Sequence, residues 1–125
     1  MGTIIAYDVL RALEKLPGMP QIDHFVTLGS PLGLPLVKQK IREEFQVPRV
    51  PLNVKRWTNF SDPGDKVALD CNLADDLRSS EGIAVQDVLV CNGYINPRGS
   101  ANNHKIYGYL RCPEFSETVA EFLRG

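Results

Sequence analysis

Apolar and polar residues follow each other along this chain with two different periods, one typical of helices and one typical of strands. Apolar side chains recur at helical spacing in three segments, which predicts helices over residues 3–16, 34–45 and 113–123. Short apolar runs bounded by Gly, Pro, Asn and Asp predict strands over residues 24–29, 53–60 and 85–91. A helical turn is also expected within residues 72–78.

Two of the predicted helices have apolar faces that we expect to pack against other elements. In the first helix a stripe is formed by Ile5, Val9, Ala12, Leu13 and Leu16, and further apolar residues widen it. A helix that is apolar on more than one side expects neighbours on more than one side. In the last helix we expect a buried face of four residues, Phe115, Val119, Phe122 and Leu123.

The alternation of helices and strands predicts an α/β layer structure, with about three mainly parallel strands flanked by helices. The helix over 34–45 is expected to cross between two parallel strands, those at 24–29 and 53–60. With 125 residues the chain is expected to form a single domain spanning residues 1–125.

Charge and composition narrow the classes of function. The chain has 14 Lys and Arg against 15 Asp and Glu, so neither nucleic acid nor a membrane surface is expected as a partner. No apolar run approaches the roughly 18 residues of a membrane-spanning helix. Three Cys without a C-x-x-C pair, and an N-terminus unlike a signal peptide, favour reduced thiols in a cytoplasmic protein. With only two His and no paired spacing, neither a metal site nor a cofactor is expected.

The candidate chemistry falls in four segments. Residues 1–10 begin with Met1-Gly2-Thr3 and run into the first helix; residues 25–33 are a strand followed by a Gly-Ser-Pro turn. Residues 57–68 are a strand followed by a turn that holds Asp62 and Asp65, and residues 102–110 contain His104.

In this order the four segments resemble the later part of an α/β-hydrolase, the family of many serine esterases and lipases, in which the acid and then the His follow the nucleophile. Gly2 resembles the closing Gly of the G-x-S-x-G elbow, whose Ser would stand just before Met1. The resemblance implies a partial three-layer hydrolase fold with the third strand also parallel. It also implies His104 as the catalytic base and Asp65 as its acid, with Asp62 as the alternative.

Other residues in these segments are expected to be structural. Ser30 in Gly29-Ser30-Pro31 superficially echoes a nucleophile, but Pro31 cannot offer the backbone N–H that the oxyanion hole of this fold takes from the following residue. Trp57 and Tyr107 are expected in the core, His24 at the entry of a strand, and Asp70 in a solvated or capping position.

The resemblance leads to three hypotheses about function. The first is a truncated serine-hydrolase-like protein that keeps the acid and the His but has no nucleophile and is inactive alone. The second is one part of a split esterase or lipase completed by another chain, and the third is a non-catalytic module that binds a small molecule or a protein. Since the strand at 24–29 and the helix at 3–16 would lack neighbours, a homodimer through either or both is expected.

Overall fold

The centre of the structure is a parallel sheet of three strands, and the computed structural model describes residues 1–125. The strands lie in the order β1 (Phe25–Leu28), β2 (Trp57–Ser61) and β3 (Val85–Leu89). The register pairs Phe25 with Trp57 and Trp57 with Val85. Both strand pairs are parallel, which confirms the predicted fold class and the orientation of the third strand.

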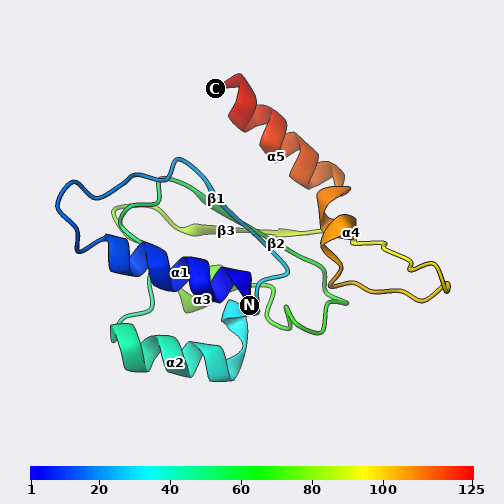
Figure 1. The fold of residues 1–125 in the computed structure, drawn as a ribbon, viewed down its shortest axis with the longest axis horizontal. Helices are drawn as coiled ribbons and strands as arrows, with labels where there is room; N and C mark the ends of the chain where they lie inside the picture. Colours follow the sequence, from blue (N-terminus) through cyan, green and yellow to red (C-terminus); the bar gives the residue numbers. More distant parts are fainter.

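Helices cover both faces of this sheet, so the fold has three layers (Figure 1). The first layer holds α1 (Gly2–Leu13), α2 (Pro35–Phe45) and α3 (Leu73–Asp76). The other face carries α4 (Ile106–Leu110) and α5 (Pro113–Arg124), and a short 3-10 turn, η1 (Pro31–Gly33), follows β1. Pro35 and Pro113 stand in the first turns of α2 and α5, where a missing N–H costs nothing.

The two faces of the sheet contain two separate apolar clusters. Ten buried residues pack between the sheet and α1, α2 and α3, with Trp57 and Tyr7 fully buried among them. Only four, Phe60, Val90, Tyr109 and Cys112, are buried beneath α4 and α5. On α2, Ile41 is buried, and Val37 and Phe45 lie against the larger cluster.

A ladder of polar side chains crosses the sheet on the side of the larger cluster. The Trp57 Nε1 donates to Thr27 Oγ1 at 3.0 Å, and Thr27 Oγ1 donates to Asn59 Oδ1 at 2.8 Å. Asn59 Nδ2 in turn donates to Asp87 Oδ1 at 2.8 Å. Because buried polar groups are costly unless paired, this ladder helps to fix the register of all three strands.

The predicted faces of α1 and α5 differ from those in the structure. On α1 the buried residues are Tyr7, Leu10 and Arg11, while Ile5 and Val9 of the predicted stripe face solvent. The helix α5 has no buried residue, and its apolar residues Val119, Phe122 and Leu123 are 36%, 47% and 76% exposed. Of the face predicted for α5, only Phe115 packs inward, against the smaller cluster, where its ring meets that of Phe60 edge-on.

Three further details of the sequence-based description were wrong. Strand β2 begins at Trp57 and not at residue 53, because residues 52–53 form a turn and Val54 makes only an isolated bridge with Ile22. The helix α4 was not predicted, and within it Tyr109 faces the core while Tyr107 is 58% exposed. Trp57, by contrast, lies in the core as predicted.

One edge of the sheet is open along β1. The amides of Phe25 and Gly29 donate to the carbonyls of Arg56 and Phe60 on the β2 side. Because backbone groups alternate in direction along a strand, those of Val26 and Leu28 point to the open edge. No helix has both the length and the apolarity needed to cross a bilayer.

Candidate acid–base site

The candidate residues meet at the carboxyl ends of the strands, where ligands usually bind in parallel sheets. Asp62 and Asp65 lie in the turn that directly follows β2. His104 lies at the end of the long loop between β3 and α4, which protrudes from the body of the molecule (Figure 1). These two loops are brought together by the parallel packing of β2 beside β3.

Asp65 is held in place by donors on several sides. Its side chain is fully buried, and its Oδ1 accepts the amides of Val67 at 2.8 Å and Ala68 at 3.3 Å. Its Oδ2 accepts the hydroxyl of Tyr109 at 2.6 Å. A carboxylate fixed in this way keeps one orientation toward any further partner.

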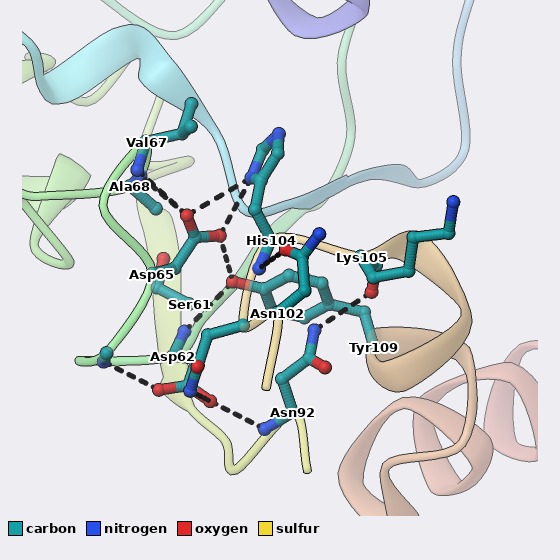
Figure 2. A network of polar contacts seen from close by, with 12 residues as sticks. Ser61, Asp62, Asp65, Val67, Ala68, Asn92, Asn102, His104, Lys105 and Tyr109 are labelled. Atoms are coloured by element: carbon teal, nitrogen blue, oxygen red, sulfur yellow. Dashed lines mark hydrogen bonds and ion pairs between the residues drawn. The ribbon is translucent and has the colours of Figure 1, made fainter. Parts of the chain in front are cut away.

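That further partner is the imidazole of His104. Its Nδ1 lies 2.9 Å from Oδ2 and 3.1 Å from Oδ1 of Asp65. The backbone N–H of His104 donates to Asn102 Oδ1, which anchors the residue in its loop. The other ring nitrogen, Nε2, has no hydrogen-bond partner within the chain; Figure 2 shows it on the side of the ring away from Asp65. The side chain is 48% exposed, so Nε2 is open to an incoming group.

The alternative acid, Asp62, makes different contacts. Its Oδ1 accepts the amide of Gly64 at 2.6 Å, and its Oδ2 accepts the amide of Asn92 at 2.6 Å and Asn103 Nδ2 at 3.1 Å. Burial alone would raise the pKa of Asp62, but these hydrogen bonds outweigh burial and hold the pKa below its ordinary value. The Asp62 carboxylate therefore ties the loops after β2 and β3 together, and the partner of His104 is Asp65.

Sequence reasoning missed Tyr109, which connects the two carboxylate residues. Its hydroxyl accepts the amide of Asp62 at 3.1 Å and donates to Asp65. Burial, and then the hydrogen bond to Asp65, raise the pKa of Tyr109, so the phenol stays protonated and keeps donating. In the sequence only its place five residues after His104 could have drawn attention to it.

Gly29 gives the Asp65 carboxylate room. It has φ +58°, and a Cβ there would lie 2.6 Å from Asp65 Oδ2 and 3.0 Å from the Tyr109 ring. Any larger residue would be strained and would displace the acid. The glycine of the Gly-Ser-Pro turn therefore shapes the site from the end of β1.

The remaining candidates lie outside this contact network. Ser30 is buried, caps η1 by accepting the Leu32 amide at 3.2 Å, and makes no hydrogen bond with His104, so its predicted structural role is confirmed. Gly2 begins α1. It lines a hollow of about 320 Å³ together with β1 and Ile106, two residues beyond His104.

His24 precedes β1 as predicted, and its Nε2 lies 2.9 Å from Thr58 Oγ1. Asp70 differs from the prediction of a solvated or capping residue: it pairs with Lys38 at 3.3 Å and accepts the Asn72 amide at 3.1 Å, but it caps no helix. The three Cys are free thiols. No three His, Cys, Asp or Glu side chains gather in a way that could hold a metal ion.

Comparison with other proteins gives no independent indication of function. No protein-family model matches the chain, and neither a curated protein nor a solved structure matches it. The likeness to α/β-hydrolases therefore stays a prediction from the sequence motifs, and function has to be argued from the geometry of the site.

Proposed function

We propose that this chain carries the acid–base half of a serine-hydrolase-type site, with Asp65 orienting His104 and His104 acting as a general base. The observation that carries the proposal is the pairing of a fully buried carboxylate with Nδ1 of a half-exposed ring whose Nε2 is free. In a Ser-His-Asp site the acid fixes the tautomer of the imidazole, and the opposite nitrogen takes the proton of the nucleophile. An imidazole suits this task because its ordinary pKa is near neutrality.

Within these 125 residues no hydroxyl or thiol is hydrogen-bonded to His104. The chain by itself is therefore proposed to lack acyl-transfer activity, since loss of the nucleophile costs orders of magnitude in rate. The isolated chain should not be labelled by a serine-directed fluorophosphonate and should show no burst with p-nitrophenyl acetate. Stoichiometric labelling would refute this part of the proposal.

The acid–base role itself is tested through the tautomer of His104. Nitrogen-detected NMR of the neutral ring should find the proton on Nδ1 and a lone pair on Nε2, because the carboxylate accepts at Nδ1. In Asp65→Asn this preference should be lost, while His24 provides an internal reference ring. An unchanged tautomer in Asp65→Asn, with the fold intact, would remove the basis for the proposal.

A second candidate function is favoured by the hollow at the open edge of the sheet. The start of α1, the strand β1 and Ile106 surround it, so a strand that paired with β1 could bring a nucleophile toward His104. In this version the chain is one part of a split esterase or lipase. A chain extended by Gly-Ala-Ser before Met1 should then react with a fluorophosphonate more slowly when His104 is replaced by Ala. The same extension ending in Ala is the matched control, and a rate independent of His104 would contradict the idea.

The open edge also supports the proposal of a homodimer. Val26 and Leu28 present unpaired backbone groups there, and Ile5 and Val9 expose apolar area on α1. Light scattering at micromolar concentration should give the mass of a dimer. Val9→Lys should weaken a dimer formed through α1, and Val26→Pro one formed through the strand edge. Leu36→Lys, at a 74% exposed position of α2, is the control. A monomer at these concentrations would count against the proposal.

A further inference from the structure

A second hollow, of about 290 Å³, lies between the turn after β2 that holds Asp62 and Asp65 and the protruding loop that carries His104. It is lined by polar residues, with one apolar exception: Gly64, Lys66, Asn96, Ala101, Asn102 and Asn103. No acidic side chain lines it, and Lys66 takes part in none of the ion pairs of the structure. The one charge that lines the hollow is therefore positive.

The hydrogen bonds of two asparagines fix which end of each side chain is available. Asn96 Oδ1 accepts the amides of Arg98 and Ser100, both at 2.9 Å. Asn102 Oδ1 accepts the amide of His104 at 3.1 Å. Because each carboxamide oxygen accepts a backbone amide, each NH₂ group is left as a free donor, and neither has a partner within the chain.

Two buried carboxylates, Asp62 and Asp65, belong to the same turn as Gly64 and Lys66, and both already have partners. Asp62 accepts hydrogen bonds from Gly64, Asn92 and Asn103. Asp65 accepts them from Val67, Ala68 and Tyr109 and lies against His104 Nδ1. The hollow therefore offers one cation and two free amide donors, against one neutral acceptor, the amide oxygen of Asn103. Such a set is matched by a group that is negatively charged and rich in acceptors.

We propose that this hollow binds an oxyanion, the carboxylate or phosphate group of a small-molecule ligand, directly beside His104. The site does not depend on the acid–base role of that histidine. If both hold, the ligand would lie with its anionic end in the hollow and the rest of the molecule extending toward Nε2.

The proposal is tested on the full chain with two simple oxyanions, inorganic phosphate and acetate, at an ionic strength held constant with chloride. The amide and side-chain NH₂ resonances of Asn96 and Asn102 should shift in a saturable way. Lys66→Gln should weaken binding roughly threefold to tenfold, as expected for loss of one partly exposed charged donor. Lys40→Gln, which removes a 78% exposed lysine of α2, should leave it unchanged.

Two isosteric variants separate ligand binding from loop structure. Asn96→Asp and Asn102→Asp keep the oxygen that accepts the backbone amides but replace the free NH₂ donor by a negative oxygen. Each should abolish anion binding while the backbone resonances of the loop keep their positions. Saturation by phosphate alone, by acetate alone or by both supports an oxyanion site and identifies its preference. No saturable response to either anion, or an equal response in Lys66→Gln, overturns the proposal.

Discussion

The two faces of the sheet are built with very different amounts of apolar packing. Under α1, α2 and α3 the cluster has ten buried residues, Trp57 among them, whereas the cluster under α4 and α5 has only four and none of them belongs to α5. The candidate site adjoins the face with the smaller apolar cluster. Tyr109 belongs to that cluster, and its hydroxyl donates a hydrogen bond to Asp65. Hydrogen bonds rather than apolar burial therefore keep the site in shape.

The largest difference between the faces is expected at two aromatic residues. Trp57→Ala should lower the free energy of unfolding by about 3–5 kcal/mol, because it leaves a cavity in the larger cluster and frees Thr27. Phe122→Ala on α5 should change it by less than about 0.5 kcal/mol, since that ring is 47% exposed. Urea denaturation measures both. Equal losses would mean that the two faces contribute alike.

Asp62→Ala is expected to lower the free energy of unfolding by about 2–4 kcal/mol, because it leaves the buried amide of Asn92 and the amide of Gly64 without an acceptor. The pKa of Asp62 is lower in the folded chain than its ordinary value of 3.8. Its contribution to stability is thus complete above that value and disappears as the pH falls through the folded pKa. Comparing the acid unfolding of the native chain with that of Asp62→Asn should show this part of the pH dependence only in the native chain.

Tyr109→Phe is expected to lower the free energy of unfolding by about 1–2 kcal/mol, since the ring keeps its packing and only the hydroxyl is lost. The amide of Asp62 then has no acceptor and Asp65 loses a donor. Thermal unfolding gives the stability change, and the Nδ1 proton resonance of His104 reports whether Asp65 has moved. An unaltered resonance would show that Asp65 keeps its orientation without the tyrosine.

The smallest effect on stability is expected at the exposed end of α5. Leu123→Ser should change the free energy of unfolding by less than about 0.5 kcal/mol, because the side chain is 76% exposed. A larger loss, measured by the same urea titration, would show that this face is covered in solution by something outside the chain.

Helical periodicity located the three longer helices because each repeats a pattern over many residues, and short apolar runs between turn residues located the strands. It could not choose between the two apolar sides of α1, since that choice depends on which side meets the sheet, and Tyr7 rather than Ile5 does so. Motif order identified His104 and both acid candidates. Their different roles follow from contacts across 30 or more residues of sequence, such as Asn92 to Asp62, which no local pattern contains. Tyr109 was missed because its contacts with Asp62 and Asp65 are also distant in sequence.

The bridge formed by the Tyr109 hydroxyl has a consequence for the order of assembly. Tyr109 is 44 positions from Asp65 and 47 positions from Asp62 along the chain. His104 and Asp65 are 39 positions apart. Closing loops of that length costs entropy before any contact is gained. A proteolytic fragment that contains either loop alone would therefore hold no paired imidazole. During refolding, the characteristic Nδ1 signal should emerge only after the strands have come into register.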